Sequence, residues 1–204
     1  MTTRKLKTGA TALLALALLC GACASAGLPA PGVAERARAA PTYSASLRAS
    51  LRGPELRGRT RVLLAFRRPD ALRIEIPGPA GARLVAVASD GRLVAVFPAE
   101  RAVFEGRATP AALDALVGVA LSPEELIDLL VGVPSSRLRS YRVRWGKDLP
   151  CEIRADLPDG SRLVARIDEA EASLELPAAA FAPPAHGGYR AIDADEARRL
   201  WGSR

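Results

Sequence analysis

The chain of 204 residues is long enough for one domain with a sizeable core, and its 29 basic residues exceed its 22 acidic ones. The excess comes from scattered arginines, with aromatic residues at only 4%, so the composition argues against a nucleic-acid-binding protein. Arg4, Lys5 and Lys7 account for part of the net charge of +7, which falls to +4 without them. The remaining arginines predict a solvated face, with attraction to anionic lipid headgroups as the alternative.

Residues 1–22 are predicted to be an export signal. They have a basic start, an apolar run over residues 10–19 and small residues after it, which are the three parts of a secretory signal. The apolar run is shorter than the about 20 apolar residues that a membrane-spanning helix needs. We therefore expect a processed segment and not a transmembrane helix.

Two cleavage patterns overlap at the end of this signal. Gly21 and Ala22 directly before Cys23 resemble the lipobox of bacterial lipoproteins, in which the cysteine is acylated, for example with palmitate, and becomes the new N-terminus. Cys20 departs from that pattern, which usually has an aliphatic residue there. The alternative is ordinary cleavage after an A-x-A triplet at 22–24 or 24–26. We expect lipidation at Cys23, and Ala24 behind it resembles an outer-membrane sorting signal.

Residues 23–41 are predicted to be a disordered tether between this lipid and a folded domain. Their Ala, Pro and Gly content leaves too little apolar surface to order the segment. With Cys20 removed and Cys23 acylated, only Cys151 is left as a thiol, so the fold cannot rely on an intramolecular disulfide.

Residues 42–192 are predicted to form the domain, mainly from β-strands. Apolar and polar residues alternate with period two over residues 43–51, 56–66, 72–76, 141–145 and 151–157, which indicates strands with one face buried. Asp90-Gly91 and Pro158-Asp159-Gly160 supply hairpin turns. The pattern therefore predicts an antiparallel meander.

Two of the predicted strands are apolar on both faces. Residues 84–88 and 93–97 consist of Leu, Val, Ala and Phe without a polar alternation. Both sides of that part of the sheet are therefore expected to be covered, one of them by helices or by a cavity.

Helices are predicted between the two groups of strands. Thr109 and Pro110 begin the first, and Ser122 and Glu125 form a capping box that begins the second. The second helix carries more large aliphatic residues than one core can take up, so some are expected to contact a ligand or a second surface. After an Ala, Pro and Gly tail, residues 189–192 are expected to form an edge strand, and residues 193–204 a short C-terminal helix or tail.

These segments resemble the LolB family of outer-membrane lipoproteins, which receive other lipoproteins, and the wider LolA/LolB-like and DUF4292-type lipoproteins. The resemblance rests on FRRPDALRIEI at residues 66–76 with GPAG at 78–81, and on LVGVALSPEEL at 116–126. It covers roughly residues 43–176. It implies an α+β fold, an antiparallel incomplete β-barrel with a short helical lid inserted between strand groups, which encloses an apolar cavity.

The resemblance also implies site residues. Pro79 and Ala80 match the membrane-facing loop, where the family has a protruding Leu that acts in cargo delivery. Leu to Ala removes roughly 2 kcal/mol of transfer free energy, which puts the membrane-insertion step in doubt. We expect the cavity to be lined by Leu64, Phe66, Leu72, Ile74, Ile76, Leu126, Leu129, Leu130 and Trp145.

No catalytic, cofactor or metal site is expected, so the sequence predicts a protein that is not an enzyme. The single histidine, His186, lies in the Pro- and Gly-rich tail without a partnered nucleophile. No phosphate-binding loop, nucleophile elbow or metal-ligand cluster is present. Asp168, Glu169 and Glu171 are interpreted as a solvated strand face.

Two functions are therefore expected. The first is binding of acyl chains or lipoproteins in the apolar cavity, as a chaperone or acceptor in protein transport to the outer membrane. The second is a scaffold for envelope assembly, which docks a protein partner without transferring lipid. The expected partners are the membrane through the lipid, acyl chains or lipoprotein cargo, and a periplasmic carrier protein, but no nucleic acid. A monomer on the periplasmic side of the outer membrane is expected.

Overall fold

The computed structural model describes residues 29–53 and 57–202. None of the helices among these residues is long and apolar enough to cross a membrane. The predicted signal and its Cys23 lie outside the described residues.

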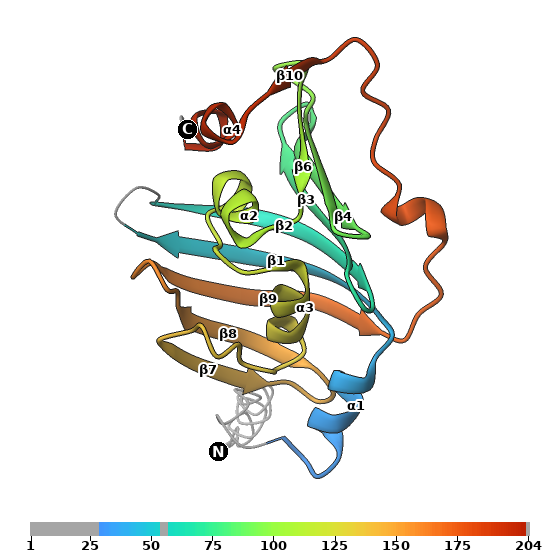
Figure 1. Cartoon of the computed structure of the whole chain (residues 1–204). Helices are drawn as coiled ribbons and strands as arrows, with labels where there is room; N and C mark the ends of the chain where they lie inside the picture. Colours follow the sequence, from blue (N-terminus) through green and yellow to red (C-terminus); the bar gives the residue numbers. More distant parts are fainter. Residues whose placement is uncertain (1–28, 54–56, 203–204) are drawn as a thin grey trace, which may run out of the picture.

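Ten strands form one open sheet (Figure 1). The strands are β1 (Thr42–Arg52), β2 (Arg57–Arg67), β3 (Ala71–Gly78), β4 (Gly81–Ser89), β5 (Arg92–Phe97), β6 (Ala102–Arg107), β7 (Ser140–Trp145), β8 (Pro150–Asp156), β9 (Arg162–Ala172) and β10 (Arg190–Ile192). Their order in the sheet is β10-β6-β5-β4-β3-β2-β1-β9-β8-β7. The predicted incomplete barrel is confirmed, because the two end strands β10 and β7 are not neighbours. The predicted edge strand is β10, which runs parallel to β6.

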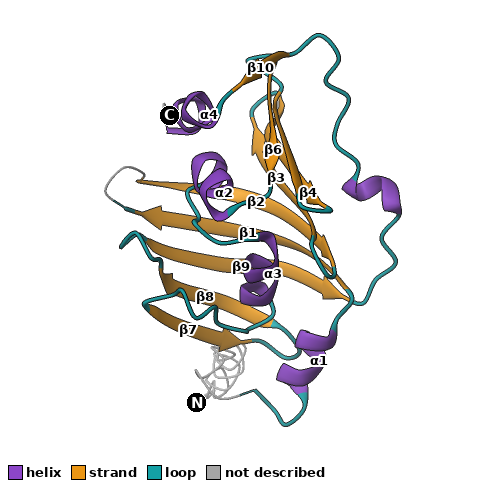
Figure 2. Cartoon of the chain, viewed as in Figure 1, coloured by secondary structure: helices purple, strands orange, loops and turns teal. Residues whose placement is uncertain are grey.

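Five short helical segments accompany the sheet (Figure 2). They are α1 (Val33–Ala39), α2 (Pro110–Val117), α3 (Pro123–Leu130), the 3-10 turn η1 (Ala178–Phe181) and α4 (Ala194–Gly202). The helices α2 and α3 connect β6 to β7 and lie over one face of the sheet, as the predicted lid requires. We call this the inner face of the sheet.

The helix starts follow the predicted capping chemistry. The Thr109 hydroxyl accepts a hydrogen bond from the Ala112 N–H at 3.2 Å. At Ser122 the capping box is complete, since its hydroxyl accepts from the Glu125 N–H at 3.2 Å and its own N–H donates to the Glu125 carboxylate at 2.8 Å. These bonds satisfy backbone donors that the first helical turn leaves unpaired, which positions α3 over the sheet.

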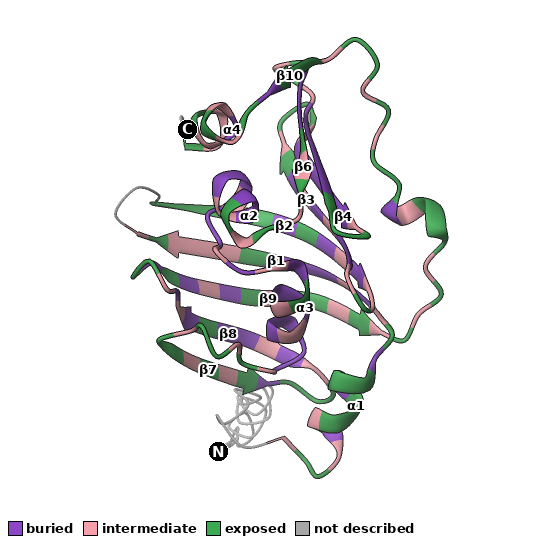
Figure 3. Cartoon of the chain, in the orientation of Figure 1, coloured by how far each residue is buried: buried purple, intermediate pink, exposed green. Residues whose placement is uncertain are grey.

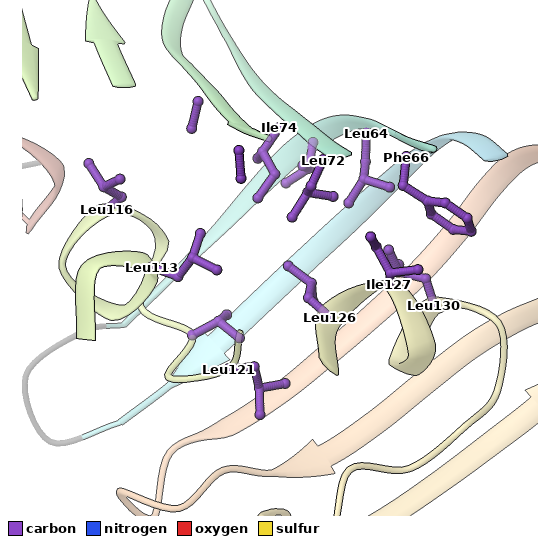
Figure 4. Packing of buried hydrophobic residues seen from close by; sticks show 14 of the residues in the cluster. Leu64, Phe66, Leu72, Ile74, Leu113, Leu116, Leu121, Leu126, Ile127 and Leu130 are labelled. Atoms are coloured by element: carbon purple, nitrogen blue, oxygen red, sulfur yellow. The ribbon is translucent and has the colours of Figure 1, made fainter. Parts of the chain in front are cut away.

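The core lies between the inner face and the helices. One large cluster joins the inward-facing side chains of the strands to those of α2 and α3. Figure 3 shows buried residues along the strands and on parts of both helices. In Figure 4, Leu126, Ile127 and Leu130 of α3 lie beside Leu64 and Phe66 of β2. Burial of these aliphatic groups is the main stabilisation of a fold for which no disulfide was expected.

The strands that are apolar on both faces are covered on both faces. On the outer side of β4, Val85 and Val87 pack with Phe181 of η1. Beyond it, Val94 and Val96 of β5 pack against Tyr189. The Ala- and Pro-rich segment before β10 therefore acts as a cover for the outer side of β4 and β5.

The prediction of a disordered tether over residues 23–41 is wrong for its last part. Residues 33–39 form α1, and Val33 and Ala37, one helical turn apart, are buried in the large core cluster. Two small apolar side chains on one helix face suffice to dock the segment, because they pack against the apolar residues of the core cluster. All three apolar clusters consist of residues from Val33 onward, so a chain that begins at Ala24 keeps every described contact.

Candidate functional site

An apolar cavity of about 200 Å³ lies between the inner face and the helices. Its floor comes from β1, β2, β3, β8 and β9, and its roof from α2, α3 and α4. The apolar side chains in its wall are Leu47, Ala49, Leu51, Val62, Leu64, Ile74, Ile76, Val117, Val119, Leu126, Leu129, Leu130, Ile153, Leu163, Ala165 and Trp201. The strand alternation explains this wall, because every second residue of each strand faces inward.

The polar groups of the wall lie at one end of the cavity. Arg57, Arg59 and Thr60 belong to the start of β2, and Arg83 belongs to the start of β4. Leu51 pairs with Gly58 at the hairpin end of β1 and β2, so this end is the one where the two strands are joined. We call the opening beside these residues the mouth.

Six of the nine residues expected to line the cavity do so. They are Leu64, Ile74, Ile76, Leu126, Leu129 and Leu130. Phe66 and Leu72 are not in the wall. They pair with each other across β2 and β3, beyond the end of the cavity opposite the mouth, and are almost completely buried. There the Phe66 ring stacks on Tyr43, with ring centroids 5.2 Å apart, so this end of the interior is filled by packed aromatic rings.

Trp145 was also expected in the wall and has a different place. Its indole lies against the backbone of Gly132, where a Cβ atom would be only 2.6 Å from the ring. Gly132 has a φ of +86°, a conformation that favours glycine. Trp145 therefore packs against the chain that leaves α3 and does not line the cavity.

The C-terminal helix α4 completes the roof, which the sequence did not predict. The Arg83 guanidinium donates to the Leu200 and Trp201 carbonyls at 3.2 and 2.9 Å and lies 5.1 Å from the Trp201 ring centroid. The Arg198 guanidinium binds the Asp114 carboxylate of α2 at 2.6 Å. These contacts hold α4 between the sheet and α2, with Trp201 in the cavity wall. The amphipathic pattern of α4 was the available signal for burial of one of its faces.

The loop expected to face a membrane is the exposed turn between β3 and β4. Pro79 and Ala80 lie at its tip and are exposed. Gly81 closes the turn with a φ of +111°. Because Arg83 follows two residues later and lines the cavity, the tip lies on the mouth side of the domain.

The wall of the cavity contains no carboxylate, histidine or cysteine among the described residues. His186 lies elsewhere, with Nδ1 2.8 Å from the Pro184 carbonyl and Nε2 2.9 Å from a Glu105 carboxylate oxygen, and these partners raise its pKa. The described residues also contain no group of three or more His, Cys, Asp or Glu side chains placed to hold a metal ion. The cavity can therefore take up an apolar chain and offer cations to a polar end group at the mouth.

No protein-family model matches this chain, and no curated protein matches it either. Solved structures with a similar fold include a LolA superfamily protein from Nitrosomonas europaea, at 12% identity and a TM-score of 0.46, with 77% of this chain and 99% of that chain covered. A DUF1329 family protein from Desulfovibrio piger has 11% identity, a TM-score of 0.45 and coverage of 73% and 92%. A domain assigned to outer membrane lipoprotein sorting from Vibrio parahaemolyticus has 8% identity, a TM-score of 0.39 and coverage of 72% and 92%.

The neighbours thus include the kind of protein that the sequence resembles, a LolA superfamily member and a lipoprotein-sorting domain. At these identities and TM-scores the likeness carries no argument about function. The function of the domain is therefore inferred from the cavity.

Proposed function

We propose that the domain binds one acyl chain in its inner cavity, without catalysis, with the polar end of the ligand at the mouth. The observation that carries this proposal is the arrangement of the wall, which is aliphatic in depth and has Arg57, Arg59 and Arg83 at one end. Transfer of an alkyl chain from water into such a space is favourable by about 0.8 kcal/mol per buried methylene. An anionic end group, such as a carboxylate or phosphate, would remain near guanidinium groups.

The size of the cavity limits what it takes up. At about 30 Å³ for each water-sized group, 200 Å³ corresponds to on the order of seven such groups. A methylene group occupies about the volume of a water molecule, so the cavity encloses about seven carbons of an acyl chain, and the rest of a longer chain would lie at the mouth. Binding of several acyl chains, as on a complete lipoprotein, would require the roof helices to move apart.

The cellular setting belongs to the same proposal. Acylation at Cys23 would hold the domain on the periplasmic side of the outer membrane, where it would accept an acyl chain or a lipoprotein from a carrier. The exposed Pro79 and Ala80 tip supports a membrane-facing loop, because it lies on the mouth side.

Occupancy of the cavity can be measured directly. The chain from Ala24 onward would be purified and tested by native mass spectrometry for bound lipid and by titration with a fluorescent fatty acid. Saturable binding of one probe per chain is expected. Ala165→Phe, which puts a ring into the cavity, is expected to reduce probe affinity at least tenfold, and Ala111→Phe on the exposed side of α2 should leave it unchanged.

Absence of both bound lipid and probe uptake would overturn the proposal. In that case the second function, a scaffold that docks a protein partner without lipid transfer, would be favoured. Equal probe affinity for the Ala165 and Ala111 variants would show that the probe binds outside the cavity.

A further inference from the structure

Ten arginines lie together on the outer face of the sheet, on the side opposite the cavity. Three rows of outward-facing residues cross β2, β1, β9, β8 and β7 near the mouth end. We call this surface the arginine face, and its arginines are Arg48, Arg52, Arg57, Arg59, Arg61, Arg142, Arg144, Arg154, Arg162 and Arg166. All ten are exposed. At a strand spacing of about 4.8 Å and a side-chain repeat of about 7 Å, they occupy an area of roughly 20 by 14 Å.

Several of these arginines stand directly opposite one another. Arg48 is paired across the strands with Arg61 on one side and with Arg166 on the other. Arg142 is paired with Arg154 in the same way. Like charges directly opposite in a sheet are destabilising, and a face selected only for solubility would alternate the two signs. The folded sheet therefore contains repulsion between neighbouring arginines, which binding to an anionic surface would relieve.

The carboxylates of this face neutralise only part of its charge. Glu152 lies among Arg144, Arg154 and Arg166, at 3.6, 2.7 and 3.1 Å. Asp156 binds Arg162 at 2.7 Å.

The third carboxylate is Asp168, which binds Arg48 at 2.6 Å. With ten arginines and three carboxylates, the arginine face has an excess of seven positive charges, and the exposed Glu169 and Glu171 lie in the rows beyond it, opposite Ser46 and Ser44.

No carboxylate among the described residues pairs with Arg52, Arg59, Arg61 or Arg142. Arg61 donates to the Ser46 hydroxyl at 3.1 and 3.2 Å, so all four guanidinium groups keep their full charge for anions from outside.

We propose that the arginine face docks on the surface of a bilayer that contains anionic phospholipids. A second copy of this chain is excluded by charge, since the same face would repel it. An acidic protein fits less well. Arginine is common in protein interfaces, but their centres are usually depleted of charge overall and anchored by aromatic residues, and no outward-facing residue of these three rows is aromatic. At the edge of the arginine face lies Leu63, which at 37% exposure is the one large hydrophobic side chain that is exposed among the described residues.

Lipid headgroups match this surface for two physical reasons. Guanidinium groups bind phosphate oxygens through paired hydrogen bonds, and a fluid bilayer can place phosphates wherever the arginines lie. Each basic residue near an anionic bilayer raises the affinity about fivefold, so several arginines without a carboxylate partner together give strong binding.

The arginine face continues into the mouth of the cavity. A groove on the arginine face is lined by seven of its arginines, Arg48, Arg52, Arg59, Arg61, Arg154, Arg162 and Arg166. Of these, Arg59 also belongs to the cavity wall. Arg57, beside it, is also in the wall. Docking would therefore bring the mouth to the headgroup layer. The functional meaning of this orientation rests on the proposed acyl-chain binding, whereas the docking itself does not depend on that proposal.

Vesicle flotation tests the docking. The unacylated chain from Ala24 onward would be mixed with vesicles of phosphatidylcholine alone or of phosphatidylcholine with phosphatidylglycerol. Flotation is expected only with the anionic vesicles and should be lost at high salt, since screening weakens exposed charges. The triple variant Arg52→Gln, Arg61→Gln and Arg142→Gln, which leaves the cavity wall intact, is expected to bind on the order of a hundredfold more weakly, at about fivefold for each arginine.

A charge-matched control separates this surface from net charge. The variant Arg92→Gln, Arg107→Gln and Arg199→Gln removes three exposed arginines outside the arginine face and should bind nearly as the parent chain does. Equal losses in the two triple variants, or equal flotation with both vesicle types, would overturn the proposal. Capture of an acidic protein without vesicle binding would overturn it as well. Fatty-acid titration of the same variants distinguishes the two proposals, because the arginine variants are expected to keep full probe stoichiometry.

Discussion

Single residues of this domain combine burial with unusual polar surroundings. Glu152 has only 8% of its side chain exposed, yet it is the shared partner of three arginines. Tyr43 is completely buried, and its hydroxyl has no hydrogen-bond partner among the described residues. Glu152 is stabilised by its arginine neighbours, whereas the buried Tyr43 hydroxyl has lost its bonds to water without gaining a partner. Their substitutions should therefore have opposite effects on stability.

Replacement of Glu152 by Gln is expected to lower the free energy of unfolding by roughly 1–2 kcal/mol near neutral pH. The expected loss is no larger because the arginine partners are exposed and solvent screens their attraction to the carboxylate. Burial raises the pKa of Glu152, but hydrogen bonds and charge from Arg154, Arg144 and Arg166 outweigh it and lower the pKa overall. Because the folded pKa is the lower one, the stabilisation is present above the ordinary pKa of about 4.5 and is lost as the pH falls through the folded value.

Urea titration at neutral and acidic pH would measure this difference. Glu169→Gln serves as the control, since that side chain is exposed and should change little. Equal unfolding free energies for the two variants at every pH would contradict the expected role of Glu152.

The variant Tyr43→Phe is expected to raise the free energy of unfolding by about 1 kcal/mol. It removes the buried hydroxyl and keeps the ring that stacks on Phe66. The same burial raises the pKa of the hydroxyl, which therefore stays protonated near neutral pH. Chemical denaturation checks the prediction, with Tyr189→Phe as a half-buried control; a loss of stability in Tyr43→Phe would show that its hydroxyl is bonded.

Among the elements, the helices of the roof decide what the sheet encloses. The caps of α2 and α3 are encoded locally, whereas α4 is held by Arg83 and by the pairing of Arg198 with Asp114. The residues of this last helix come after a long cover segment on the outer side. Its position over the mouth therefore depends on contacts between segments far apart in sequence.

Replacement of Trp201 by Ala should accelerate release of the fluorescent fatty acid about two- to fivefold. The indole contributes to the cavity wall and lies below the Arg83 guanidinium, a contact worth about 0.5–1 kcal/mol at a partly exposed site. Stopped-flow displacement measures the rate. Arg199→Ala on the exposed side of α4 provides the comparison, and identical release rates for the two variants would argue against a covering role of α4.

At the scale of the whole molecule, the sheet separates two surfaces of opposite character. Its inner face and helices enclose an aliphatic cavity, and its outer face gathers ten arginines. The two surfaces meet at the mouth, where Arg59 belongs to both. A lipid at Cys23 would add a third contact with the membrane, through the segment before residue 29.

Replacement of Cys23 by Ser is expected to release the protein from membranes after a high-salt wash. Salt weakens binding through the arginine face, whereas several acyl chains hold stably on their own. Fractionation of cells that express the full chain would measure the distribution, with Cys20→Ser as the control that should stay in the membrane fraction. Retention of the Cys23 variant after the wash would contradict lipidation at this residue.

Much of the fold could be predicted because its signals are local. The alternation in β1, β2, β7 and β8 identifies which side chains face inward, and the capping residues locate the starts of α2 and α3. The strands β6 and β9 were not separately predicted, since Glu105 and the charged second half of β9 interrupt the apolar alternation. The helix α1 was missed because two small apolar residues in seven are a weak periodic signal.

The sequence by itself determined the faces of the strands, the caps of the helices and the hairpins between sequential strands, because these depend on neighbours within a few residues. Only the tertiary structure decided how far the cavity extends, since alternation assigns Leu64 and Phe66 to the same face but not to the wall or the packed end. It also decided that α4 closes the roof and that scattered arginines form one face. These features arise from strand register between distant segments, which local sequence patterns do not encode.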